Sequence, residues 1–83
     1  MSTLSRDQIR AMMAEVLAAQ GKQMPGDDQA NLEEIGFRSL DFSELALRVE
    51  DEIDEELNFD APQLRQIATV SDVLDFLEQL QAA

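Results

Sequence analysis

The sequence predicts an all-α protein: a small four-helix bundle with three main helices, a short third helix and an unusually long first loop. Two observations predict this fold class. Apolar side chains recur at helical spacing in three separate stretches, and no stretch alternates apolar and polar side chains as a half-buried strand does. With 83 residues, the chain is expected to form a single domain, residues 1–83, around one small core.

The first main helix is predicted to open at Ser5 and to stop at Gly21. Ser5 followed three residues later by Gln8 is a capping-box pattern, which marks a helix start. Gly21 follows the last apolar residue of the periodic stretch, as glycine often does at a helix end. The apolar residues at helical spacing are Ile9, Met12, Met13, Val16 and Leu17.

Residues 21–38 are predicted to form a long connection. The Pro25-Gly26 pair and the polar residues 27–31 favour a turn and a loop. In the second half of this connection, three apolar residues are expected to anchor the loop to the core: Leu32, Ile35 and Phe37.

A second main helix is predicted from about Ser39 to about Leu57. At about 100° per residue, its apolar residues form one stripe and its charged residues fall on the opposite, outer face. Leu40 and Leu47 leave the apolar stripe and border the acidic face, so we expect them to form a small exposed docking patch. The outer face comprises Asp41, Glu44, Arg48, Asp51, Glu52 and Glu55.

Two further elements complete the predicted bundle. A short helical segment is expected near Ala61 to Ile67, with Pro62 in its first turn. Thr69 and Asp72 form another capping box, which predicts the start of the last main helix. The apolar stripe of this helix is Val73, Leu74, Leu77 and Leu80.

The chain is strongly acidic, with 18 acidic and 6 basic residues and a net charge of −12. This balance argues against binding to nucleic acid or to anionic membranes, since both need basic side chains, and favours partners with basic surfaces. The start of the chain lacks the pattern of a signal peptide, and no apolar stretch approaches the roughly 20 residues of a membrane span. Together with the absence of cysteine, these features lead us to expect a cytoplasmic protein.

Ser39 is the candidate functional residue, and three roles are open to it. It could cap the second helix, which is the common role of a serine at a helix start. It could act as a nucleophile, but the chain has no histidine, no cysteine and a single lysine, Lys22, so we expect no enzyme. It could also carry a group that another protein attaches, because the long loop beside it leaves room for an enzyme to reach the hydroxyl.

The sequence around Ser39 resembles that of acyl carrier proteins and the related peptidyl carrier domains. Their motif is usually written Gly-x-Asp-Ser-Leu, and this chain has Gly36-Phe37-Arg38-Ser39-Leu40 followed by Asp41. The helix order, the long first loop and the acidic second helix also match, so the resemblance extends from about residue 9 to residue 80. Arg38 departs from the family pattern, which commonly has aspartate immediately before the serine.

The resemblance implies that Ser39 carries 4′-phosphopantetheine, transferred from coenzyme A by a phosphopantetheinyl transferase. The thiol of this arm would hold an acyl or aminoacyl group as a thioester. The partners implied are that transferase and the acyl-loading and condensing enzymes of polyketide, fatty-acid or related biosynthesis, with basic docking surfaces, meeting a monomeric carrier. The expected docking residues are Arg38, Leu40, Asp41, Glu44, Leu47, Arg48, Asp51 and Glu55.

Three alternatives remain beside this interpretation. The chain could be a peptidyl or aminoacyl carrier, or an acidic helical adaptor that binds a basic partner without any attached group while Ser39 merely caps its helix. Binding of a divalent cation is disfavoured, because the stretch Asp27-Asp28-Gln29-Ala30-Asn31 lacks the glycine and the closing glutamate of an EF-hand loop.

Overall fold

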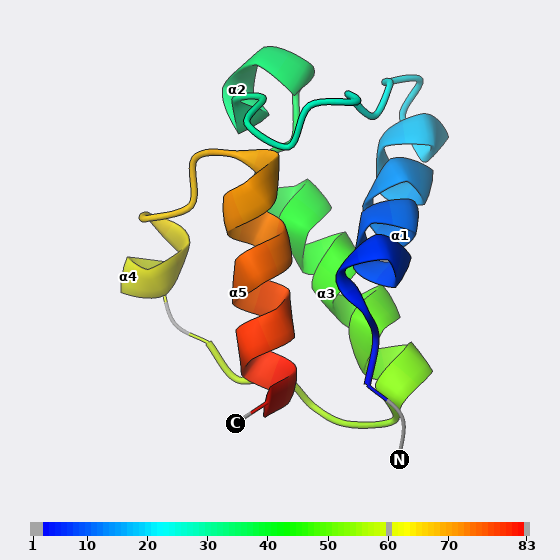
Figure 1. Ribbon diagram of the computed structural model, residues 1–83, viewed down its shortest axis with the longest axis vertical. Helices are drawn as coiled ribbons and strands as arrows, with labels where there is room; N and C mark the ends of the chain where they lie inside the picture. Colours follow the sequence, from blue (N-terminus) through cyan, green and yellow to red (C-terminus); the bar gives the residue numbers. More distant parts are fainter. Residues whose placement is uncertain (1–2, 60, 83) are drawn as a thin grey trace.

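A computed structural model of the protein describes residues 3–59 and 61–82. The described residues form five helices and no strand, in keeping with the predicted all-α bundle. Three long helices lie side by side, while α2 sits across one end of the bundle and α4 lies beside α5 (Figure 1). The helices are α1 (Arg6–Ala19), α2 (Leu32–Ile35), α3 (Ser39–Ile53), α4 (Ala61–Leu64) and α5 (Val70–Ala82).

The predicted helix starts are confirmed at both capping boxes. The Ser5 hydroxyl accepts a hydrogen bond from the Gln8 N–H at 3.2 Å, and the Gln8 side chain accepts one from the Ser5 N–H at 2.8 Å. At the start of α5, the Asp72 carboxylate accepts from the Thr69 N–H at 3.0 Å, and the Thr69 hydroxyl accepts from the Asp72 N–H at 3.2 Å. Each pair satisfies backbone groups that have no partner inside the helix.

The core fills the space between α1, α3 and α5. The anchors Leu32 and Phe37 are 9% and 5% exposed. The apolar stripe predicted for the second main helix is buried throughout, and its residues are Phe42, Leu45, Ala46, Val49, Ile53 and Leu57. The rings of Phe42, Phe59 and Phe76 form a cluster with centroids 5.6 to 6.0 Å apart. This cluster extends the core toward α4, on the side where the candidate site lies.

The long connection after α1 is fixed against the start of α5. Asn31 forms an isolated β-bridge with Thr69. The Val70 N–H donates to the Ala30 carbonyl at 3.1 Å, and the Leu32 N–H donates to the Ala68 carbonyl at 2.9 Å. The connection also contains α2, a helix of four residues that the sequence did not predict.

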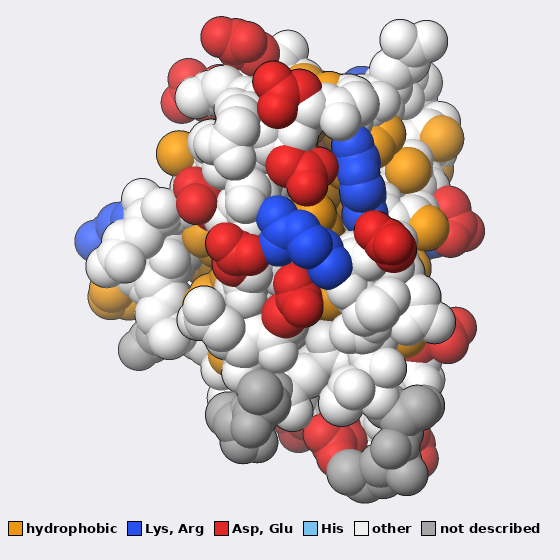
Figure 2. Space-filling model, viewed as in Figure 1, with side chains coloured by type: hydrophobic (Ala, Val, Ile, Leu, Met, Phe, Trp, Pro, Cys, Tyr) orange, Lys and Arg blue, Asp and Glu red, His pale blue; other side chains and the backbone are white. Residues whose placement is uncertain are grey.

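Two arginines of α1 hold the same connection from the other side. Asp28 of the loop pairs with Arg6 at 3.5 Å and with Arg10 at 3.4 Å. Arg6 also pairs with Asp75 and Glu78 of α5. Figure 2 shows basic side chains lying among acidic ones on this face of the molecule. The long loop is therefore tied to α1 and α5 and enters α2 in a defined position.

The ends of α3 and α4 differ from the prediction. The second main helix was expected to reach Leu57, but it ends at Ile53, and Asp54 adopts a left-handed conformation with φ 55° as its C-cap. The Glu50 side chain then accepts a hydrogen bond from the Leu57 N–H at 2.7 Å, which keeps the turned chain against the helix. The short helix α4 includes Pro62 but stops at Leu64 rather than Ile67.

Within the described residues, no helix combines the length and the apolar character needed to cross a bilayer.

Candidate functional site

Ser39 is the first residue of α3, and its side chain is exposed. Of the three roles left open for Ser39, the capping role is excluded, because Arg38 is the N-cap of α3, with extended backbone angles of φ −107° and ψ 179°. Among the described residues, the Ser39 hydroxyl makes no hydrogen bond. The hydroxyl is therefore free to react, at the helix end where backbone N–H groups lack partners within the helix.

The residues before Ser39 explain this position. Gly36 ends α2 in the left-handed conformation, with φ 77°. Phe37, buried in the core, follows and donates its N–H to the Leu32 carbonyl at 2.9 Å. The chain then runs out to the surface through Arg38 and enters α3. A left-handed glycine and a buried aromatic anchor thus present Ser39 at a sharp turn between two helices.

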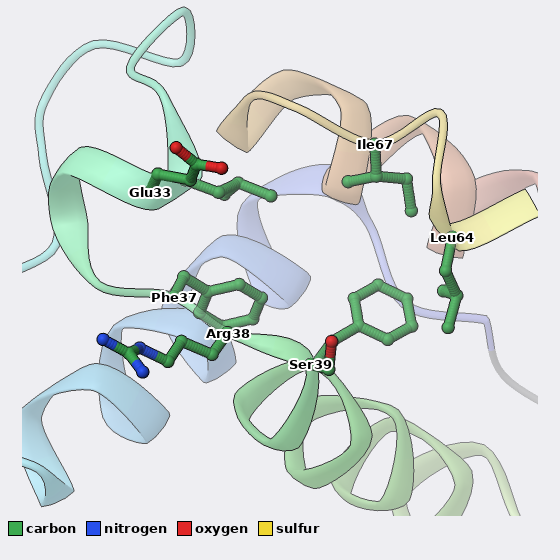
Figure 3. Close-up of a pocket in the computed structure, with 8 residues that line it drawn as sticks. Glu33, Phe37, Arg38, Ser39, Leu64 and Ile67 are labelled. Atoms are coloured by element: carbon green, nitrogen blue, oxygen red, sulfur yellow. The ribbon is translucent and has the colours of Figure 1, made fainter. Parts of the chain in front are cut away.

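A pocket of about 540 Å³ opens beside Ser39. In Figure 3 the Ser39 hydroxyl points toward the space in front of Leu64 and Ile67, and the Arg38 guanidinium extends away from it. Glu33 lies across the pocket from Ser39. Most of the wall is apolar, and its residues are Leu32, Glu33, Phe37, Arg38, Ser39, Phe42, Leu64 and Ile67.

Asp41 does not lie on the outer face of α3, and this expectation is wrong. Only 4% of Asp41 is exposed, because its side chain turns back toward the start of its own helix. It accepts a hydrogen bond from the Arg38 N–H at 2.8 Å and another from the Gln20 side chain, and Lys22 lies 3.7 Å away. Burial by itself raises the pKa of Asp41, but these three donors outweigh burial and lower the pKa below its ordinary value.

Most of the other predicted docking residues do share one side of α3. Leu40 is 84% exposed and Leu47 is 58% exposed, so the expected pair of surface leucines is present. Glu44 and Asp51 are also exposed, and Arg48 pairs with Glu44 at 3.4 Å. Between α1 and α3, a groove of about 350 Å³ is lined by Val16, Ala19, Gln20, Leu40, Asp41, Glu44 and Arg48.

Two predicted docking residues, Glu55 and Arg38, lie outside the exposed side of α3, one beyond each end of the helix. Glu55 is exposed but follows the end of α3, so it does not continue the outer face of the helix. Arg38 is exposed beside Ser39 and forms no ion pair with another described residue. The basic residues Arg6, Arg10, Lys22 and Arg48 do form such pairs.

Sequence reasoning missed the residues that reach the site from outside α3. Gln20 and Lys22 come from the end of α1 and the loop after it, and Leu64 and Ile67 come from α4 and the turn that follows. Lys22 carried a weak signal as the only lysine of the chain. Across residues 3–59 and 61–82, no group of three or more His, Cys, Asp or Glu side chains is placed to hold a metal ion.

Comparisons with known proteins identify the family of the chain and support its fold. The family model for the phosphopantetheine attachment site matches residues 7–77, a range that includes Ser39. The chain belongs to the acyl carrier protein family. The prosthetic group of this family is 4′-phosphopantetheine.

Two members of the acyl carrier family illustrate the similarity. An acyl carrier protein of Phaeodactylum tricornutum is 48% identical over 46 residues, which make up 55% of this chain and 58% of that protein. The crystal structure of an acyl carrier protein from Thermotoga maritima superposes with a TM-score of 0.70 at 25% identity, covering 93% of this chain and 91% of the other. The predicted all-α bundle of the acyl-carrier type is thus confirmed.

Proposed function

We propose that this chain carries acyl intermediates as thioesters on 4′-phosphopantetheine attached to Ser39 and presents them to biosynthetic enzymes. One observation carries the proposal: Ser39 has an exposed, unbonded hydroxyl at the first position of α3, beside a pocket with apolar walls. The pathway, whether polyketide, fatty-acid or related, stays a prediction.

The surroundings of the other hydroxyl groups support the choice of Ser39. The Ser5 hydroxyl caps α1, and the Ser71 hydroxyl accepts a hydrogen bond from Arg6 at 2.8 Å. Ser43 is exposed, but it lies one turn into α3, where the backbone N–H groups are already bonded within the helix. Ser39 alone of these four combines exposure, a free hydroxyl and a helix start.

The residues around Ser39 suit an attached phosphodiester and a flexible arm. The N–H groups in the first turn of α3 and the positive end of the helix dipole favour a negative charge there. Phe37, Phe42, Leu64 and Ile67 offer apolar surface along which the arm could lie. When attached, the arm supplies the thiol that forms the thioester, and the chain has no cysteine to compete with it.

We propose that the partners dock along α3. Exposed Leu40 and Leu47 supply short-range contact, while Glu44 and Asp51 attract basic surfaces. The expected partners are a phosphopantetheinyl transferase and acyl-loading and condensing enzymes, acting on a monomeric carrier in the cytoplasm. Arg38 places a positive charge next to the attachment point, so we expect it to influence which partners are accepted.

We further propose that the chain has no catalytic activity of its own. The chain has no His or Cys side chain, and its one lysine is engaged with the Gly36 carbonyl, Gln20 and Asp41. The usual Ser-His and Ser-Lys arrangements that activate a serine are therefore missing around Ser39. An aminoacyl cargo remains the alternative for a carrier, and a non-covalent adaptor is the alternative if Ser39 is never modified.

The proposal is tested by incubating the protein with coenzyme A and a broad-specificity phosphopantetheinyl transferase and measuring its intact mass. We expect one added phosphopantetheine and one new titratable thiol. Ser39→Ala should lose both, while Ser43→Ala, which removes the neighbouring exposed hydroxyl, should be modified like the parent. A parent chain that several transferases leave unmodified would favour the adaptor.

A further inference from the structure

Lys22, Gln20 and Asp41 meet beneath the turn that leads into Ser39. Lys22 is the only lysine of the chain, and Asp41 is the only buried charged side chain among the described residues. Lys22 comes from the loop after α1 and Asp41 from the first turn of α3, so their contact joins two elements that flank the site. We call this contact the Lys22–Asp41 clip.

Lys22 binds both sides of the turn. Its ammonium donates to the Gly36 carbonyl at 2.6 Å and to the Gln20 side chain at 3.1 Å, and it lies 3.7 Å from the Asp41 carboxylate. The stem of Lys22 also lies against Gly36, since a Cβ at position 36 would come within 3.1 Å of the lysine Cε atom. Lys22 therefore fixes the end of α2 relative to the start of α3.

Asp41 extends this connection to the residue immediately before Ser39. The Arg38 side chain makes no capping hydrogen bond. The Asp41 carboxylate accepts a hydrogen bond from the Arg38 backbone N–H. Because the carboxylate is buried and held by Gln20 and Lys22, the Arg38 backbone is held as well. Ser39 is the next residue in the chain, so holding the Arg38 backbone also restricts where Ser39 lies.

We propose that Lys22 and Asp41 are positioning residues for the modification of Ser39, an inference that rests on the proposed function. In that reaction a bond forms between Ser39 Oγ and the phosphorus that carries the pantetheine arm in coenzyme A. The pyrophosphate bond breaks, 3′,5′-adenosine bisphosphate leaves, and the serine proton passes to a base on the transferase. A nucleophile held in the reactive geometry reacts faster once bound, so the clip acts on kcat rather than on KM.

The test is steady-state kinetics of a broad-specificity phosphopantetheinyl transferase with the full chain as substrate. Lys22→Met, Asp41→Asn and the double variant are compared with the parent. Arg10→Met is the matched control, because Arg10 also ties the long loop to a carboxylate but pairs with Asp28, away from Ser39. All variants are measured at a temperature at which circular dichroism shows them folded.

We expect each single variant to lower kcat by about tenfold, equivalent to about 1.4 kcal/mol, with KM changed by less than about twofold. The double variant should be no slower than the slower single variant, because both substitutions remove one connection. Amide exchange at the Arg38 N–H should become faster in both single variants, and Arg10→Met should match the parent in kcat. If Asp41→Asn does not fold, the same comparison is decided by Lys22→Met.

Three results would contradict the proposed positioning role of the Lys22–Asp41 clip. A loss confined to KM, an equal loss of kcat in Arg10→Met, or single variants within about twofold of the parent in kcat would show that the contact does not position Ser39. A modified parent with unaffected variants overturns this inference alone. A parent that is never modified overturns the proposed function, and the inference with it.

Discussion

Leu45 and Leu47 lie two residues apart on α3 but face opposite surroundings, Leu45 fully buried and Leu47 58% exposed. Leu45 packs in the core with α1 and α5, whereas Leu47 lies on the same outer side as Glu44 and Asp51. One side of α3 therefore stabilises the bundle, and the other is free to meet a partner. Substitutions on the two sides should separate stability from binding.

The two leucines give the first prediction. Leu45→Ala should lower the free energy of unfolding by about 2–5 kcal/mol, because it removes buried methyl groups and leaves a cavity. Leu47→Ala should change it by no more than about 0.5 kcal/mol, since little packing is lost at an exposed position. Urea denaturation of both variants measures the difference. Comparable losses in the two would contradict the assignment of the faces.

The acidic residues of α3 give the second prediction. Glu44→Lys or Asp51→Lys should lower kcat/KM with an enzyme that docks on α3 by about tenfold at low salt, since an attraction becomes a repulsion. The effect should shrink as salt screens the charges. Asp7→Lys makes the same change of charge at an exposed position in the first turn of α1, outside α3, and should leave the rate near that of the parent. Equal rates for all three variants would remove these residues from the docking surface.

Arg38 gives the third prediction. Arg38→Asp should change the ratio of kcat/KM between two phosphopantetheinyl transferases of different surface charge by at least about threefold, because a charge beside the reacting hydroxyl reverses. Arg65→Asp is the matched control: Arg65 is also exposed, and its substitution changes the net charge equally. A ratio that is the same for Arg38→Asp, Arg65→Asp and the parent would mean that Arg38 has no part in partner choice.

The capping carboxylates predict a loss of stability in acid. The N–H groups of Ala68 and Thr69 lower the pKa of Asp72, and the donors around Asp41 lower its pKa as well. A lowered pKa in the folded state stabilises the protein at pH values above the ordinary carboxyl pKa of about 4, and this stabilisation is lost as the pH falls through the folded pKa.

Asp72→Asn measures this contribution. At pH 7 the variant should be less stable than the parent by about 1 kcal/mol, as is typical for a weakened helix cap. As the pH falls through the folded pKa of Asp72, the two free energies of unfolding should converge, because the parent carboxylate is then protonated too. A difference that stays constant from pH 7 to pH 2.5 would argue against the lowered pKa.

Local patterns were sufficient to predict most of the fold. The spacing of apolar residues and the Ser5 and Thr69 capping boxes are decided within one or two helical turns, so α1, the start of α3 and α5 were readable from the sequence. The helix α2 has only four residues, too few for a periodic pattern. The end of α3 depends on Asp54 taking a left-handed conformation, which its residue type permits but does not require.

The candidate site was predictable only in part. The exposure of Ser39, Leu40 and Glu44 agrees with the helical pattern. The burial of Asp41 does not, because it depends on Gln20 and Lys22, about twenty residues earlier in the chain. Helical periodicity places a side chain on a face, but it carries no information about which distant residues cover that face.

Peptide-level mass spectrometry of the protein after reaction with coenzyme A and the transferase tests the role of Ser39 most directly. Fragmentation of the peptide that contains both Ser39 and Ser43 distinguishes the two hydroxyls. We predict that every modified molecule carries phosphopantetheine on Ser39. Modification at Ser43 or at another hydroxyl, with Ser39 unchanged, would contradict the proposed attachment site.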